Sequence, residues 1–236
     1  MIREHIDKLT LGHVLELGPF NAPVVTGDNV DYMDILDTDE LDARALICGR
    51  PGKSPHIKYV RRDGRLTDIP MMYDSVLSCH SIEHTFDLVE HMRDVANVLR
   101  PGGRYIAIIP DKRYCFDHFQ PESDIYDVMS AHLAPKQRYA EHVLRHRCAT
   151  THNDAVRHWR GDHGTAELTL ESLQTAWSEA MSSDSVDVHH WFFTPESIVK
   201  IVNALYNMQF CNLKVEQTFD TKPNELEFTL VLRKQL

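Results

Sequence analysis

Two short apolar runs near the start of the chain each end in a carboxylate. Residues 13–18 read His-Val-Leu-Glu-Leu-Gly, and Asp34 closes the next run sixteen positions after Gly18. In open α/β sheets the ligand lies outside the carboxyl ends of the strands. There a glycine lets the backbone approach the ligand, and an acid binds ribose hydroxyls. The pattern therefore predicts the first half of a nucleotide-binding βαβ unit.

Composition limits the class of protein. A chain of 236 residues with 42% hydrophobic residues predicts one globular domain, residues 1–236. A formal charge of −10 would repel a phosphate backbone, so we expect no nucleic-acid partner. The five cysteines are odd in number and contain no C-x-x-C pair, which favours a reducing, cytoplasmic location without disulfides. The absence of a signal-peptide core or a long apolar run leads us to expect no membrane span.

Alternating strand and helix patterns predict the fold class. Strand-length apolar runs occur at 13–17, 30–36, 57–61, 75–79, 105–109, 211–217 and 226–232. Helical patterns occur at 87–99, where the apolar residues share one face, and from Thr194 to about residue 208. The alternation predicts an α/β fold with a doubly wound, mostly parallel seven-stranded sheet of the Rossmann-like type.

Residues 111–190 interrupt this alternation with a long segment rich in histidine and arginine. A structureless loop of this length is rare inside a compact domain, so we predict helices near 123–133, 135–149 and 165–181. We expect this helical insertion, 111–190, to form a cap over the ligand edge of the sheet.

The first loop restricts the cofactor. A dinucleotide fold uses G-x-G-x-x-G to bind a pyrophosphate at a helix N-terminus. Here residues 18–23 read Gly-Pro-Phe-Asn-Ala-Pro, with one glycine and two prolines that remove amide donors. The loop suits a cofactor with ribose and adenine but no phosphate, and Glu16 suits one that carries positive charge. S-adenosylmethionine is such a molecule.

Six motifs follow one another along the chain: Leu-Glu-Leu-Gly-Pro at 15–19, Val-Asp-Tyr-Met-Asp at 30–34, His-Ser-Ile-Glu-His at 80–84, Val-Leu-Arg-Pro-Gly-Gly at 98–103, Ile-Pro-Asp-Lys-Arg-Tyr-Cys-Phe-Asp at 109–117 and His-His-Trp-Phe-Phe-Thr-Pro-Glu-Ser at 189–197. In this order and spacing the chain resembles class I S-adenosylmethionine-dependent methyltransferases, and among them a bacterial subgroup associated with glycan biosynthesis. The resemblance covers nearly the whole chain. It departs from the commoner pattern in the first loop, where that pattern has two or three glycines.

The resemblance implies a cofactor site. It puts Glu16 and Gly18 beside the methionine part, Asp34 on the ribose hydroxyls and Asp63 beside the adenine. The cofactor-binding residues expected are Glu16, Gly18, Pro19, Asn21, Asp34, Ile35, Asp63, Gly64, Cys79, His80 and Ser81. Plainer interpretations stay open: the acids at 16 and 34 would cap strand ends by binding loop amides, Asp63 would be a turn residue, and Cys79 would be a small buried group.

Methyl transfer to a hydroxyl requires a group that takes the proton, and histidine suits this role at neutral pH. We expect His84, His80 and Asp111 to be catalytic, with a helix-start role as the alternative for His84. The acceptor-binding residues expected are Lys112, Arg113, His118, His189, His190 and Trp191. Solvated loop charges and core aromatic residues are the alternatives for this set.

Histidines in the insertion raise the question of a metal. His142 and His146 are spaced i, i+4 on a predicted helix, and His158 and His163 follow. Such pairs without a nearby acidic partner are usually surface residues, so we expect no metal. The leading function is O-methylation of a sugar, a glycan-linked acceptor or another small molecule. N- or C-methylation of a metabolite, a non-catalytic cofactor-binding module and a metal-dependent hydrolase are the alternatives, and a homodimer is left open.

Overall fold

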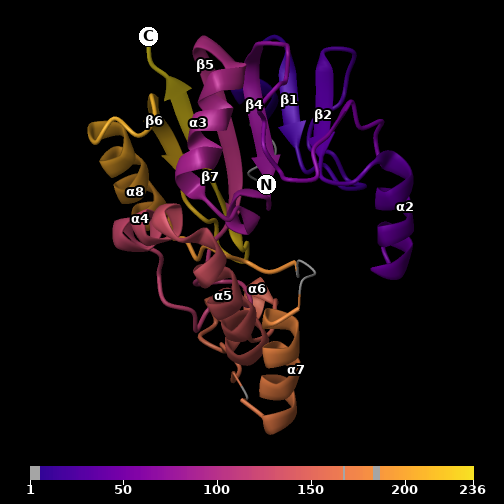
Figure 1. The fold of residues 1–236 in the computed structure, drawn as a ribbon, viewed down its shortest axis with the longest axis vertical. Helices are drawn as coiled ribbons and strands as arrows, with labels where there is room; N and C mark the ends of the chain where they lie inside the picture. Colours follow the sequence, from indigo (N-terminus) through magenta and orange to yellow (C-terminus); the bar gives the residue numbers. More distant parts are fainter. Residues whose placement is uncertain (1–5, 167, 183–186) are drawn as a thin grey trace.

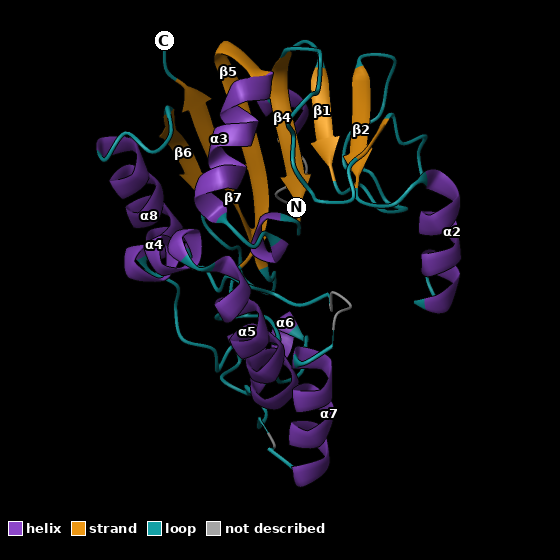
Figure 2. Cartoon of the chain, in the orientation of Figure 1, coloured by secondary structure: helices purple, strands orange, loops and turns teal. Residues whose placement is uncertain are grey.

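The seven predicted strands are all present. The computed structural model describes residues 6–166, 168–182 and 187–236, apart from the side chains of residues 135–139. The strands are β1 (Val14–Leu17), β2 (Val30–Asp34), β3 (Tyr59–Val60), β4 (Tyr73–Cys79), β5 (Leu99–Pro110), β6 (Leu213–Phe219) and β7 (Glu227–Lys234). They form one sheet in the order β3-β2-β1-β4-β5-β7-β6 (Figures 1 and 2).

The sheet is mixed. Strands β1 to β5 pair in parallel, whereas β7 pairs antiparallel with both β5 and β6. The expectation of a mostly parallel sheet therefore holds for the amino-terminal part, and the carboxy-terminal strands make the sheet mixed. The strand order reverses between β1 and β4, which is the point where ligands bind in open α/β sheets.

Both long helices predicted outside the insertion are confirmed. Helix α3 (Leu88–Val98) begins at the N-cap Asp87, and α8 (Pro195–Asn207) begins at Thr194, which forms a capping box with Ser197. Helix α2 (Thr38–Ile47) was not predicted, because only Leu41 and Ala45 of it are buried and its apolar periodicity is weak. Short helices α1 (Ile6–Leu9) and η2 (Ile82–His84) complete this part of the chain.

The connection between β1 and β2 differs from the expectation of a βαβ unit. Residues 18–29, all of which the structure describes, form turns and extended segments without a helix. Two prolines, Pro19 and Pro23, lie in this segment and lack the amide hydrogen that an interior helical position needs. The buried carboxylate of Glu16 holds the segment against β1 by accepting the amides of Val24 and Val25.

The core lies mainly on one face of the sheet. Helices α3, α4 (Ile125–Leu133) and α8 contribute apolar side chains to one large cluster with β1, β4, β5 and β7. A smaller cluster on the other face includes Ile6 from α1 and Val25 from the β1–β2 segment. Among the described residues, every helix is too short or too polar to traverse a lipid bilayer.

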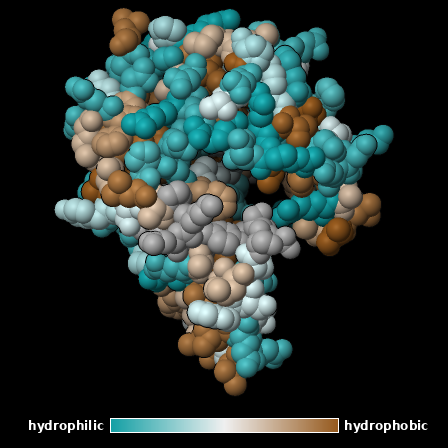
Figure 3. Space-filling model, viewed as in Figure 1, coloured by the Kyte–Doolittle hydropathy of each residue, from teal (hydrophilic) through white to brown (hydrophobic). Residues whose placement is uncertain are grey.

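Helices occupy the predicted insertion. They are α4, α5 (Pro135–Ala149), α6 (Ala155–Trp159) and α7 (Leu170–Ala180), so the three predicted helices are present and α6 is additional. In Figure 1, α5, α6 and α7 lie below the sheet, on the side toward which the arrows of β1 and β4 point. Figure 3 shows apolar side chains at the lower tip; exposed apolar residues of α7 include Leu170 and Trp177. That the insertion caps the active site stays a prediction.

Candidate active site

The acid at the end of β1 supports the first loop. Glu16 is 1% exposed, and its oxygens accept the amides of Val24 at 2.7 Å and Val25 at 3.1 Å. These contacts agree with the alternative stated for Glu16, in which an acid at a strand end binds loop amides. A contact of Glu16 with the methionine part of the cofactor stays a prediction. Pro19 is buried, and the Asn21 amide donates to the carbonyl of Arg50.

Gly18 brings the first loop against the segment that follows β4. Its φ of +64° is in the left-handed region, and its amide donates to the carbonyl of Met33 at 2.9 Å. A Cβ at Gly18 would lie 3.4 Å from the Ser81 hydroxyl. Two residues predicted to bind the cofactor from different strand ends are therefore neighbours.

The end of β2 carries the predicted ribose-binding acid. Asp34 is 8% exposed, and its Oδ1 accepts the amide of Leu36 at 3.1 Å. Burial raises the pKa of this carboxyl, although amides of Leu36, Ile35 and Phe20 oppose the shift. Ile35 is 47% exposed, so an apolar surface lies beside the acid.

The segment after β3 lies close to this surface. Gly64 has a φ of +68°, and a Cβ there would lie 4.0 Å from Ile35 Cγ2. Asp63 is exposed, and its Oδ1 accepts the amide of Arg65 at 3.0 Å, as in a turn. The structure thus brings Asp34, Ile35 and Gly64 together, and the contact of Asp63 with adenine stays a prediction.

The chain turns sharply after β4. Cys79 is the last residue of the strand, and His80 follows with a φ of +49°, which is uncommon for a residue with a side chain. Its amide donates to the carbonyl of Ile108 at 2.9 Å, so β5 holds the turn in place. Strained backbone of this kind is concentrated at functional sites. The turn leads into η2, which directs Glu83 into the interior.

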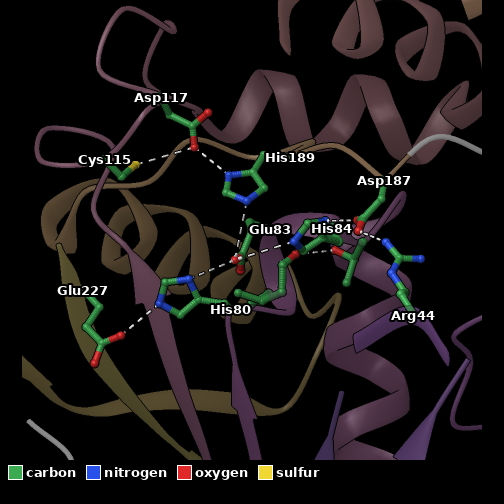
Figure 4. A network of polar contacts seen from close by, with 11 residues as sticks. Arg44, His80, Glu83, His84, Cys115, Asp117, Asp187, His189 and Glu227 are labelled. Carbon is green, nitrogen blue, oxygen red and sulfur yellow. Dashed lines mark hydrogen bonds and ion pairs between the residues drawn. The ribbon is translucent and has the colours of Figure 1, made fainter. Parts of the chain in front are cut away.

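Three imidazoles surround the Glu83 carboxylate (Figure 4). His80 Nδ1, His84 Nε2 and His189 Nε2 each lie 3.9 Å from Glu83 Oε1. His80 and His84 come from the segment after β4, whereas His189 comes from the end of the insertion. Glu83 also fixes that end, because its carbonyl accepts the amide of His190 at 2.7 Å.

A carboxylate lies at the other nitrogen of each imidazole. Glu227 Oε2 is 2.9 Å from His80 Nε2, Asp187 Oδ1 is 2.9 Å from His84 Nδ1, and Asp117 Oδ2 is 2.6 Å from His189 Nδ1. Burial alone would lower the pKa of His84, but the carboxylates of Asp187 and Glu83 outweigh burial and raise it. The same contact with His84 lowers the pKa of Asp187.

Asp111 lies apart from this group of imidazoles. Its buried carboxylate accepts Arg113 Nε at 2.9 Å and the Thr221 hydroxyl at 2.7 Å. Among the described residues, no hydrogen bond or ion pair joins Asp111 to the three imidazoles. Asp111 and Arg113 therefore neutralise each other, and their predicted roles in catalysis and acceptor binding stay predictions.

The remaining predicted acceptor-binding residues have different surroundings. Lys112 Nζ donates to the carbonyl of His118 at 3.0 Å, and both side chains are half-buried. Trp191 is 1% exposed in the main core, and its indole donates to the carbonyl of Thr85 at 2.6 Å. His190 is buried beside His142, with 2.9 Å between the Nδ1 atoms.

The histidines of the insertion separate into different environments. His142 contacts His190, whereas His146 lies near Phe116 and His189, so this i, i+4 pair does not share one site. Phe116 and His146 also line a shallow, open hollow with Thr150, Thr151 and Asn153. A second group consists of His118, His158 and His163, whose ligand atoms lie within 4.8 Å of one another.

Four acids of the site were not predicted: Glu83, Asp117, Asp187 and Glu227. Glu83 and Asp117 lie within motifs noted in the sequence, and the apolar spacing around Glu83 gave no sign that it is buried. Asp187 and Glu227 are distant in sequence from the imidazoles that they contact, so no local pattern could have indicated them.

Comparisons with known proteins agree with this geometry. Residues 24–107 match the family model described as a methyltransferase domain. No curated protein matches the chain. The fold is similar to that of the CcbJ methyltransferase from Streptomyces caelestis, with a TM-score of 0.52 and 11% identity over 99% of this chain and 88% of that chain.

A second solved structure has a similar fold. An S-adenosylmethionine-dependent methyltransferase from Clostridium acetobutylicum has a TM-score of 0.50 and 11% identity over 100% of this chain and 89% of that chain. At such identities these structures establish the fold alone. The family match over 24–107 covers β2 to β4 and most of β5, including the predicted ribose-binding acid and the segment after β4. The chain therefore carries a segment that matches a methyltransferase domain, within a fold that it shares with an S-adenosylmethionine-dependent methyltransferase.

Proposed function

We propose that this chain is an S-adenosylmethionine-dependent methyltransferase, and that it methylates an oxygen of a sugar, a glycan-linked acceptor or another small molecule. The observation that carries the proposal is the pair of imidazoles, His80 and His84, at the carboxyl end of β4, each with a carboxylate at its second nitrogen. A hydroxyl is a poor nucleophile until its proton is removed, and oriented imidazoles serve this purpose. The resemblance to the glycan-associated bacterial subgroup supports a sugar as the acceptor.

The reaction is a displacement at the methyl carbon. The hydroxyl oxygen forms the new O–C bond, and the C–S bond breaks with its electron pair remaining on sulfur. The hydroxyl proton leaves to an imidazole, so the products are the methyl ether and S-adenosylhomocysteine. Because the oxygen, carbon and sulfur must be in line, positioning and exclusion of water supply much of the acceleration.

The insertion provides the acceptor side in this proposal. Residues 111–190 form a helical cap of a single domain, and His189 extends from the end of the cap toward Glu83. Lys112 and Arg113 would attract an acceptor that carries a phosphate or a uronate. His118 and His190 would contact its neutral part. A cytoplasmic location, expected from the cysteines, belongs to the same proposal.

Turnover with a panel of acceptors tests the proposal. S-adenosylhomocysteine release is measured with free sugars, nucleotide sugars and small phenols, and the methylated atom is identified by NMR. We expect His84→Ala to lower kcat by about a hundredfold or more with little change in cofactor affinity. His56→Ala, at an exposed histidine, is the matched control.

Three results would contradict the proposal. Tight cofactor binding in calorimetry without turnover on any acceptor would favour a non-catalytic module. A product methylated on nitrogen or carbon would favour the alternative chemistry. Equal turnover of His84→Ala and His56→Ala would return His84 to a structural role.

A further inference from the structure

The burial of the Glu83 carboxylate is not compensated by hydrogen bonds. Its side chain is 0% exposed, and neither carboxylate oxygen has a hydrogen-bond partner in the part of the chain that the structure describes. A buried polar group without a partner costs about 1–3 kcal/mol, and a charged group costs more. Such a group in a folded protein needs an explanation, and one explanation is an ion bound at that position.

The distances around Glu83 fit a shared ion better than they fit direct hydrogen bonds. Three ring nitrogens lie 3.9 Å from Oε1, which is too long for a hydrogen bond. Two ligands that are each about 2.1 Å from one ion lie roughly 3–4 Å apart, depending on the angle between them. The ligand atoms of Glu83, His84 and His189 also lie within 4.8 Å of one another.

The carboxylates behind the imidazoles match the second coordination layer of metal sites. A metal-binding histidine almost always donates its other ring N–H to a carboxylate, a carbonyl or water. Here Asp117 and Glu227 hydrogen-bond His189 and His80 in this way, and Asp187 contacts His84. These contacts leave the second nitrogen of each ring, the one toward Glu83, free to bind an ion (Figure 4).

The excess of negative charge around the three imidazoles also favours a bound cation. Four carboxylates, those of Glu83, Asp117, Asp187 and Glu227, surround three imidazoles. Arg44 offsets one of them by pairing with Asp187 at 2.5 Å. A dication at the centre would offset much of the remaining negative charge, including that of the buried Glu83 carboxylate.

We propose that Glu83, His84 and His189 bind one divalent transition-metal ion. Imidazole nitrogens favour ions such as zinc or iron over magnesium and calcium, which prefer oxygen ligands. Two imidazoles and one carboxylate supply three ligands, and the half-exposed His80 and His84 leave an approach for an acceptor oxygen as a further ligand. Zinc is the first ion to test because it is bound by this ligand set without a redox requirement.

The histidine group of the insertion is the competing location. His118, His158 and His163 could also approach one ion, and His158 Nδ1 lies 3.0 Å from His163 Nδ1. That group has no buried carboxylate without a partner among the described residues. His118 stacks on His163 with 3.7 Å between ring centroids, so ring packing explains their proximity.

This inference deepens the proposed function. An imidazole that coordinates an ion has no free electron pair, so His84 would act on the acceptor through the ion, as a Lewis acid, whereas His80 stays available to take the hydroxyl proton. The role in activation rests on the proposed function, whereas binding of the ion does not.

Metal content of the purified full chain tests the binding. The chain is purified without a metal-affinity tag, stripped with a chelator and titrated with Zn²⁺ or Mg²⁺ by calorimetry, and bound metal is counted by mass spectrometry. We expect one zinc ion per chain and no saturable magnesium binding. Glu83→Gln and His189→Ala should lose the zinc, whereas His163→Ala should retain it.

Folding of each variant is checked by circular dichroism. If Glu83→Gln or His189→Ala does not fold, Asp117→Asn removes only the carboxylate behind His189 and should weaken zinc affinity by about 10–100-fold. Zinc retained by these variants, or lost in His163→Ala, would overturn the inference. Methyl transfer by a metal-free enzyme, insensitive to chelator, would overturn the role of the ion in activation and leave the proposed function intact. Zinc bound at this site without methyl transfer would overturn only the proposed function.

Discussion

Replacement of Asp34 tests how this fold holds its cofactor. Asp34→Asn keeps the size of the side chain and an acceptor for the amide of Leu36, which lies 3.1 Å from Oδ1. The change removes the negative charge from the carboxylate oxygens that would accept hydrogen bonds from the ribose hydroxyls. Hydrogen bonds to a charged group contribute about 1.5–3 kcal/mol, so S-adenosylmethionine affinity should fall by about 10–150-fold.

Isothermal titration calorimetry measures this affinity, and urea unfolding checks that the variant is folded. Asp39→Asn, at an exposed acid in the first turn of α2, is the matched control and should bind as the unmodified protein does. Because burial raises the pKa of Asp34, cofactor affinity of the unmodified protein should also weaken earlier in mild acid than an ordinary carboxylate would predict. An Asp34→Asn variant with unchanged affinity would refute the assignment of this acid to the ribose.

The other predictions concern stability. Burial lowers the pKa of His91 to about 4. The free energy of unfolding that this shift affects is therefore highest above pH 6.5, and it falls by about 3 kcal/mol in total as the pH drops toward 4. In urea unfolding, the free energy of unfolding of His91→Gln should depend less on pH than that of the unmodified protein. An equal dependence in the two proteins would contradict this. Trp191→Ala should lower the free energy of unfolding by about 3–5 kcal/mol, and a loss below 1 kcal/mol would contradict its place in the core. Gly103→Ala should destabilise by about 1–3 kcal/mol, because its Cβ would lie 2.9 Å from the carbonyl oxygen of Arg100; an unchanged unfolding midpoint in urea would contradict this.

The sheet was predictable because buried strands carry their pattern locally. Each apolar run formed a strand, and Thr194 capped α8 as expected. Strand ends were less predictable: a helix at 87–99 and a strand at 105–109 were expected, with residues 100–103 between them. The chain instead enters β5 at Leu99, and a register shift against β4 accommodates the extra residues.

The site was only partly predictable. His80, His84 and His189 were named as functional residues, and the structure brings these three imidazoles around one carboxylate. That carboxylate, Glu83, was not named, because its burial results from packing between η2 and the segment at 188–191. Sequence spacing indicates which residues share an element, but it does not indicate which elements converge at one point.

The inserted helices are joined to the site at both of their ends. Asp117 lies before α4 and His189 lies after α7, and the two side chains meet at 2.6 Å. Deleting the whole insertion would therefore remove the imidazole of His189 and the carboxylate of Asp117 along with the helices. A deletion confined to the outer tip of α7 would leave both ends of the insertion in place.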